Sequence, residues 1–217
     1  MGKKVLYYKN DRKEMIPLLP NEYSTVLEIG CGEGNFRKNL SLEHGYWAVE
    51  PYEVSANIAE KKIDTVLCGT YEEMYNHIPD GYFDLVICND VIEHLIDYDR
   101  FFQSIRTKIK KNGCLIASIP NVRYVKNLNE LLIKKDWEYK NDGILDRTHL
   151  RFFTEKSLKR AVFDNGFVVD QFIGINPYKK KGFGVKRVLY SLAIFILGAD
   201  VRFMQLGICI RSKENSF

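Results

Sequence analysis

Short runs of apolar and β-branched residues alternate with amphipathic stretches along most of the chain. The apolar runs cover residues 25–29, 46–50, 65–67, 83–88 and 114–119, and most of them end in Gly, Pro, Asn or an acid. The stretches at 35–42, 53–61 and 99–109 place apolar side chains on one helical face, as Phe102, Ile105 and Ile109 do. Alternating strands and helices predict a parallel sheet with helices on both faces and ligands at the carboxyl ends of the strands.

The last third of the chain departs from this simple alternation. A helix is predicted at 155–165, a strand at 166–173 and a last strand at 203–211, which brings the total to seven strands. The segment 122–153 is too long for a plain connection, so we expect an insertion or lid over the active site there. An apolar helical segment is expected at 177–200, before the last strand. No repeat or second domain is visible, and residues 1–217 are expected to form a single domain.

Composition and charge narrow the class of protein. The 217 residues carry 32 Lys and Arg against 28 Asp and Glu, and the small excess is scattered along the chain. This small and scattered excess of positive charge therefore disfavours a nucleic-acid partner. The five cysteines are an odd number without a CxxC pair, and the amino-terminal residues become charged before an apolar signal segment can form. We expect a cytoplasmic protein.

The sharpest motif is a strand that runs into a glycine turn, with the sequence VLEIGCGEGNF at residues 26–36. A dinucleotide-binding loop would read GxGxxG, but here the third glycine, Gly34, comes one residue early. Glu28 would also place a carboxylate beside a pyrophosphate, which is electrostatically unfavourable. The loop therefore disfavours NAD and suits a ligand that carries positive charge.

A second acid, Glu50, ends the next strand twenty residues after Gly30, where it can accept hydrogen bonds from a ribose diol. Together these residues resemble the class I S-adenosylmethionine-dependent methyltransferases, and the resemblance covers about residues 24 to 120. It implies an α/β, Rossmann-like fold with a seven-stranded, mostly parallel sheet, an antiparallel last strand and helices on both faces. It also implies S-adenosylmethionine as the cofactor and S-adenosylhomocysteine as its product.

The resemblance assigns cofactor-binding positions residue by residue. Glu28 orients the loop or the amino group, and Glu50 holds the ribose hydroxyls. The other implied positions are Gly30, Gly32 and Gly34 at the methionyl and ribose portion, Cys31 as a small loop residue among them, Gly69 and Thr70 near adenine, and Asn89 and Asp90 near the methionyl group and the transferred methyl.

The run NDVIEHL at residues 89–95 resembles the branch with ubiquinone-biosynthesis O-methyltransferases and bacterial sugar-modifying enzymes. On a helical turn, Asp90, Glu93 and His94 would share one face. With His149 they form a candidate site for Mg²⁺, Mn²⁺ or Zn²⁺. Two other interpretations stay open, namely direct acid or base catalysis by His149 or His94, and purely structural roles.

A sugar hydroxyl is a poor nucleophile, so its methylation needs a base with a pKa near neutrality or a metal that acidifies it. His149 is the predicted base, with Asp146 or Asp90 as its orienting partner, and His94 and Asp90 are further catalytic candidates. Arg147 and Arg151 are predicted to bind a phosphate or carboxylate of the acceptor, unless they are solvated or paired with Asp146.

The run of residues 146–154 resembles bacterial methyltransferases of surface-polysaccharide synthesis. The expected acceptor is therefore a small molecule, a sugar or sugar conjugate, methylated on oxygen. One alternative is a metal-dependent enzyme that acts on a quinone-pathway phenol or an RNA 3′ ribose. Another is a non-catalytic module that binds S-adenosylmethionine.

The apolar run at 189–199 is too short to span a bilayer. It follows Lys179, Lys180, Lys181, Lys186 and Arg187, so a helix that rests on a membrane surface is one interpretation. The other interpretation is that this apolar run is buried, either as a lid or in the interface of a homodimer.

Overall fold

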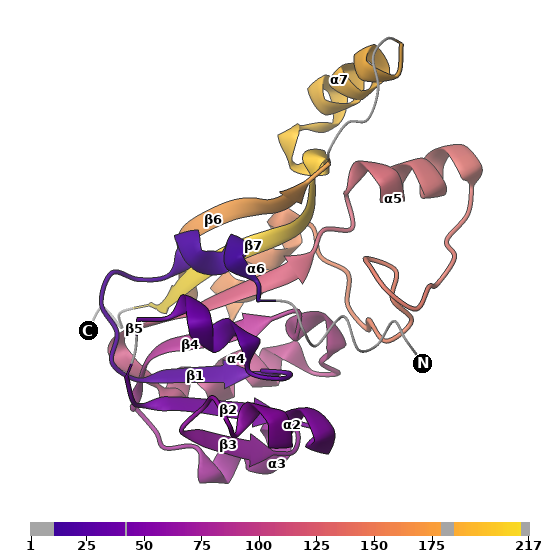
Figure 1. The fold of residues 1–217 in the computed structure, drawn as a ribbon. Helices are drawn as coiled ribbons and strands as arrows, with labels where there is room; N and C mark the ends of the chain where they lie inside the picture. Colours follow the sequence, from indigo (N-terminus) through magenta and orange to yellow (C-terminus); the bar gives the residue numbers. More distant parts are fainter. Residues whose placement is uncertain (1–10, 42, 179–184, 214–217) are drawn as a thin grey trace.

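The computed structural model describes residues 11–41, 43–178 and 185–213. Seven strands form one sheet in the order β3-β2-β1-β4-β5-β7-β6 (Figure 1). They are β1 (Val26–Ile29), β2 (Tyr46–Glu50), β3 (Thr65–Cys68), β4 (Phe83–Asn89), β5 (Ile109–Pro120), β6 (Phe167–Pro177) and β7 (Phe203–Ser212). In this spatial order, each strand from β3 through β2, β1 and β4 to β5 is parallel to its neighbour, and β7 is antiparallel to both β5 and β6. The predicted sheet, with its antiparallel last strand, is confirmed.

Six α-helices and several shorter helical turns connect these strands in the described part of the chain. The helices are α2 (Glu53–Ala59), α3 (Tyr71–Met74), α4 (Tyr98–Lys108), α5 (Val125–Asn129), α6 (Glu155–Asp164) and α7 (Val185–Leu197). The turns are η1 (Lys13–Leu18), η2 (Asn35–Asn39), η3 (Tyr75–His77), η4 (Ile92–His94), η5 (Glu130–Lys134) and η6 (Ala199–Arg202). Thr70 and Thr154 begin α3 and α6 with capping boxes, which satisfy backbone N–H groups of the first turn.

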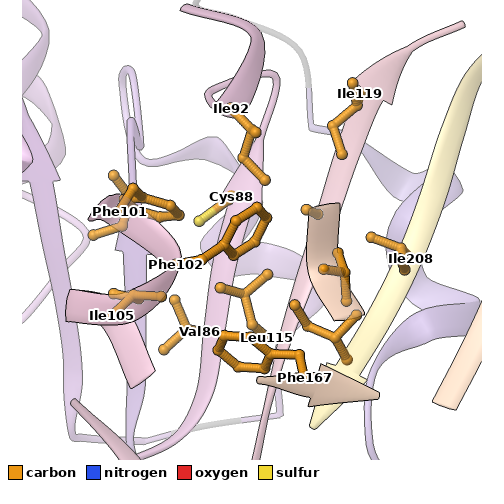
Figure 2. Packing of buried hydrophobic residues seen from close by; sticks show 14 of the residues in the cluster. Val86, Cys88, Ile92, Phe101, Phe102, Ile105, Leu115, Ile119, Phe167 and Ile208 are labelled. Carbon is orange, nitrogen blue, oxygen red and sulfur yellow. The ribbon is translucent and has the colours of Figure 1, made fainter. Parts of the chain in front are cut away.

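Apolar side chains bury both faces of the sheet. On one face, Phe101, Phe102 and Ile105 of α4 pack onto the central strands β4 and β5 (Figure 2). On the other face, Met15 and Leu18 of η1 pack with buried residues of β1, β2 and β4. Because both faces are covered, the central strands are almost wholly apolar, as the sequence pattern predicts.

The carboxyl ends of the parallel strands meet at one edge of the sheet. Ile29 of β1 pairs with Cys88 of β4, and Cys88 pairs with Ala117 of β5. Because β7 runs the opposite way, it begins at this same edge, where Gln205 pairs with Pro120. The glycine turn, the end of β4 and the start of β7 are therefore neighbours.

The long segment 122–153 begins with α5 and η5 and then continues as irregular chain. Its end returns to the sheet through a bridge between Asn121 and Phe153. Tyr124, Ile144 and Leu145 form a small apolar cluster of their own. Lys179, Lys180 and Lys181, which the sequence analysis placed before the apolar helix, lie outside the described residues. Among the described ranges, we find no helix that is long and apolar enough to span a bilayer.

Candidate functional site

The glycine turn after β1 adopts a backbone that only glycine tolerates well. Gly30, Gly32 and Gly34 all have positive φ, at 71°, 55° and 71°. A Cβ atom on Gly30 would lie 2.9 Å from Val91 Cγ2. The turn is thus pressed against the loop that follows β4, at the carboxyl ends of the strands.

Glu50 holds this turn in place. Its Oε2 accepts a hydrogen bond of 2.7 Å from the Gly32 N–H, and its Oε1 accepts one of 3.0 Å from the Tyr52 N–H. Burial raises the pKa of the carboxyl, and the two N–H donors oppose that rise. Each oxygen keeps a second lone pair, so the carboxylate retains the capacity to accept from the two hydroxyls of a ribose.

We expect Glu50→Ala to weaken binding of S-adenosylhomocysteine by about 5- to 150-fold, because a charged acceptor is worth about 1–3 kcal/mol. Calorimetric titration measures this loss. An analogue without the ribose hydroxyls should bind the variant and the wild type equally well, whereas exposed Glu60→Ala should change neither affinity. An equal loss for both ligands would assign Glu50 to the glycine turn alone.

Glu28 is buried in β1 and accepts a hydrogen bond from the Tyr46 hydroxyl. Burial raises the pKa of this carboxyl to about 8, and the nearby Glu50 adds to the rise. Glu28 is therefore mostly protonated at neutral pH, which suits a residue that supports the turn through Tyr46. A cationic ligand within reach would lower this pKa again.

The raised pKa of Glu28 predicts a pH-dependent stability. Between the ordinary value of 4.5 and about 8, the folded state holds a proton that the unfolded state releases, so the free energy of unfolding falls as pH rises. For one proton the slope reaches about 1.4 kcal/mol per pH unit. We expect Glu28→Gln to flatten urea-unfolding stability between about pH 5 and 8 relative to the wild type. Parallel curves for the two proteins would contradict the raised pKa.

Asn89 carries a buried side-chain amide that no other group satisfies in the described part of the chain. Its side-chain Nδ2 and Oδ1 are buried at the end of β4 and have no hydrogen-bond partner among the described residues. A buried amide of this kind is costly unless a ligand or water satisfies it. The positive-φ glycine turn, Glu50 and this amide together fit an amino-acid-bearing nucleoside such as S-adenosylmethionine.

The remaining predicted cofactor positions have local roles that the structure makes clear. Gly69 follows β3 and donates its N–H to the Glu50 carbonyl oxygen at 3.1 Å. Thr70 caps α3, so its hydroxyl is engaged with Glu73. Burial raises the pKa of the Cys31 thiol, which makes it an inert small residue in the turn. Contact of Gly69, Thr70 and Cys31 with a cofactor stays a prediction.

The structure brings Glu93, His94 and His149 together at this edge of the sheet. One potential ligand atom from each lies within 4.8 Å of the others. The His149 Nε2 lies 4.0 Å from Glu93 Oε1, and the two imidazole rings meet edge to face at 4.8 Å between centroids. The Glu93 carbonyl oxygen accepts from the N–H groups of Leu150 and Arg151, which fixes the two segments to each other.

Hydrogen bonds to backbone carbonyls set the protonation of both rings. His94 Nδ1 lies 3.1 Å from Thr148 O, and His149 Nδ1 lies 2.9 Å from Ile144 O. A carbonyl oxygen only accepts, so each Nδ1 carries the proton and each neutral ring keeps a lone pair on Nε2. That lone pair is what a general base or a metal ligand needs.

Glu93 is fully buried, and neither of its carboxylate oxygens has a hydrogen-bond partner in the described chain. Burial and repulsion from Asp90 raise its pKa well above the ordinary value. An unpaired buried carboxyl beside two imidazoles is expensive for folding and is typical of a functional site. It fits a divalent cation, and it equally fits an imidazolium formed during catalysis.

Asp90 does not share a helical face with Glu93 and His94, so that expectation is wrong. Its φ is 56°, and the helical turn η4 begins only at Ile92. The carboxylate instead forms an ion pair with Arg12 and accepts hydrogen bonds from Ser118 Oγ at 3.0 Å and Gln205 Nε2 at 2.7 Å. These contacts engage both Asp90 oxygens. Glu93, rather than Asp90 or Asp146, is the acid whose carboxylate lies 4.0 Å from His149 Nε2.

Arg12, Ser118 and Gln205 are site residues that sequence reasoning missed. They come from the chain before β1, from β5 and from β7. Arg12 stands in the charged run KNDRK, which reads as a solvated surface, yet its side chain is only 11% exposed. No local pattern links it to Asp90, because the contact joins residues 78 positions apart.

The two predicted substrate arginines lie beside the cluster. Arg147 donates to the carbonyl oxygens of Lys140 and Tyr139, and Asp146 accepts from Thr148 rather than from Arg147. Arg151 donates to backbone carbonyls and lines a cavity of about 520 Å³ between α4 and α6. Arg160 lines the same cavity together with Asp99 and Asp164, so side chains of both charges meet there.

Comparison with known proteins agrees with this geometry. Residues 4–171 match a family model described as a methyltransferase domain. The chain is 29% identical over 169 residues to the ubiquinone biosynthesis O-methyltransferase of Bradyrhizobium diazoefficiens. That match covers 72% of this chain and 64% of the relative, so the chain spans less than two thirds of the relative's length.

Solved structures share the fold at low identity. A SAM-dependent methyltransferase from Archaeoglobus fulgidus superposes with a TM-score of 0.66 at 19% identity, covering 96% of this chain and 94% of its own. A possible histamine N-methyltransferase from Thermotoga maritima gives 0.64 at 22% identity, with 95% and 89% covered. At these identities the likeness concerns the fold.

Proposed function

The chain belongs to the class I S-adenosylmethionine-dependent methyltransferases, and we propose that it is an O-methyltransferase whose acceptor is a hydroxyl of a small molecule. One observation carries the proposal. The imidazoles of His94 and His149 lie together with the Glu93 carboxyl, whose oxygens have no hydrogen-bond partner in the described chain, and Glu93 and His94 come a few residues after the end of β4. Transfer to oxygen needs such groups, because a neutral hydroxyl must lose its proton.

The cofactor, when bound, supplies a methyl group that is already activated on a sulfonium. The chain's own residues then align and deprotonate the acceptor. The glycine turn and Glu50 would hold the nucleoside of the cofactor, and the Asn89 amide would bind its amino-acid portion. His149, with its proton fixed on Nδ1 by the Ile144 carbonyl, accepts the acceptor's proton on Nε2. An imidazolium 4.0 Å from Glu93 would lower the raised pKa of that carboxyl, so its ionised form would stabilise the ring.

For the acceptor we propose a sugar hydroxyl of a sugar conjugate. The support is the resemblance of residues 146–154 to surface-polysaccharide enzymes and the presence of Arg147 and Arg151 beside the cluster, suited to a phosphate or carboxylate. We also propose that residues 122–153 close the acceptor side, because this segment carries His149 and returns to the sheet at Phe153.

A second candidate is metal-assisted methylation of a catechol or other phenol. Glu93, His94 and His149 would hold a divalent cation, whose chemistry is to acidify a bound hydroxyl. The orphaned Glu93 oxygens favour it, as does the likeness to a protein named ubiquinone biosynthesis O-methyltransferase.

The test is formation of S-adenosylhomocysteine with two acceptor panels, nucleotide-activated sugars and catechols, each with and without EDTA. Turnover of a sugar that survives EDTA supports the base mechanism. Turnover of a catechol that EDTA abolishes and Mg²⁺ restores supports the metal mechanism. A third panel of amines is the control, and methyl transfer to these amines alone would overturn O-methylation.

A further inference from the structure

Helix α7 lies at the same edge of the sheet as the candidate site. It connects the end of β6 to the start of β7, and Pro177 and Phe203 pair with each other at that edge. Arg123 fixes the carboxyl end of α7 through an ion pair of 2.6 Å with Asp200 and a hydrogen bond to the Leu197 carbonyl oxygen. Beyond this anchor the helix projects away from the sheet (Figure 1).

One face of α7 is apolar and open. Leu192, Phe195 and Ile196 are 49%, 87% and 68% exposed. Their spacing of three and four residues places them on one side of the helix. Tyr190 belongs to the other side, where its ring packs 5.0 Å from that of Tyr178. Three large apolar side chains on one projecting turn are an unusual surface for contact with water.

The sequence that carries this face is rich in positive charge. Residues 177–202 contain six Lys and Arg against one acid, Asp200, which is paired with Arg123. Lys126 of α5 adds a further cation, with its Nζ 5.5 Å from the centroid of the Tyr178 ring at the base of α7. A basic segment with an apolar face is complementary to a surface of anionic headgroups over acyl chains.

We propose that α7 seats its Leu192–Phe195–Ile196 face in an anionic lipid surface. The helix has 13 residues, about 20 Å at 1.5 Å per residue, which suits lying in the interface rather than crossing the bilayer. Because α7 stands at the carboxyl edge of the strands, this contact turns the candidate site toward the membrane and toward acceptors carried on lipids. The lipid contact itself does not depend on the proposed reaction.

The experiment is flotation of the full chain with vesicles of phosphatidylcholine alone and of phosphatidylcholine with about one-quarter phosphatidylglycerol. We expect binding to the anionic vesicles only, weakened at least tenfold by 0.5 M salt. Phe195→Ser/Ile196→Ser should lose at least tenfold of that binding. Phe163→Ser is the matched control, because Phe163 is 61% exposed near the start of β6, at the opposite edge of the sheet.

Binding of S-adenosylhomocysteine checks that each variant is folded and separates this test from the proposed function. Absence of vesicle binding, or binding that the double substitution leaves unchanged, would overturn the proposal. So would a concentration-dependent dimer that the double substitution dissolves, seen without vesicle binding, because the face would then serve a second copy of the chain.

Discussion

Replacing His149 by alanine is expected to lower kcat for methyl transfer by about 10²- to 10⁴-fold, the usual contribution of a positioned acid or base. The ring is fixed at Nδ1 by the Ile144 carbonyl, and its Nε2 faces Glu93. The measurement is kcat with the best acceptor from the two panels. Affinity for S-adenosylhomocysteine should stay near the wild-type value, because the residues proposed to hold the nucleoside are Glu50 and the glycine turn, and His149 is not among them.

His44→Ala is the matched control, since its side chain is 89% exposed and should leave kcat unchanged. A His149→Ala variant that keeps more than about one third of wild-type kcat would contradict a catalytic role.

Glu93→Gln decides between a metal site and a base, because it keeps the shape of the side chain and removes its charge. Titration of Mn²⁺ into protein saturated with S-adenosylhomocysteine should show binding that weakens in both Glu93→Gln and His149→Ala if a metal is held there. No binding in the wild type would leave His149 as the base.

Replacing Arg12 by alanine is expected to destabilise the fold by about 3–5 kcal/mol, the usual effect of breaking a buried ion pair. The side chains of Arg12 and Asp90 are only 11% and 9% exposed, and Arg12 also donates to Ser118 Oγ at 2.6 Å. Loss of the guanidinium leaves a buried carboxylate on a residue whose backbone is already in the left-handed region. Urea unfolding at neutral pH measures the change.

A double substitution separates the unpaired charge from lost packing. Arg12→Met/Asp90→Asn removes both charges and should recover much of the stability that Arg12→Ala loses. The pair between Arg211 and Asp170 supplies a control, because both side chains are about 40% exposed and Arg211→Ala should cost roughly 1 kcal/mol or less. Equal losses for Arg12→Ala and Arg211→Ala would show that burial of the Arg12 pair contributes nothing.

The fold was predictable because its signals are local. Each of β1 to β5 carries its own apolar run, and α4 and α6 carry their apolar faces at helical spacing. The glycine turn was equally predictable from the sequence. Its backbone has positive φ at three positions within five residues, and glycine is the residue type that tolerates positive φ. Glu50 follows the same logic, because the end of a parallel strand must lie beside the end of its neighbour.

The acid and histidine cluster was predictable only in part. The sequence shows Glu93 and His94 next to each other, but the position of His149 depends on the path of an irregular segment. That path is fixed by hydrogen bonds from the segment's backbone to the Glu93 carbonyl oxygen. Asp90 was misplaced because a helical turn was assumed from residue 90, whereas its left-handed backbone directs the carboxylate to Arg12.

The sequence by itself determined the order of strands and helices along the chain, the glycine turn and the kinds of side chain available for chemistry. These features depend on residues close along the chain, or on the rule that the carboxyl ends of parallel strands meet at one edge of the sheet. Only the tertiary structure decided that Arg12, Ser118 and Gln205 share Asp90, that Glu93 faces His149, and that the apolar face of α7 stands open at the same edge. Such contacts join distant positions through hydrogen bonds and burial, which leave no period or motif in the chain.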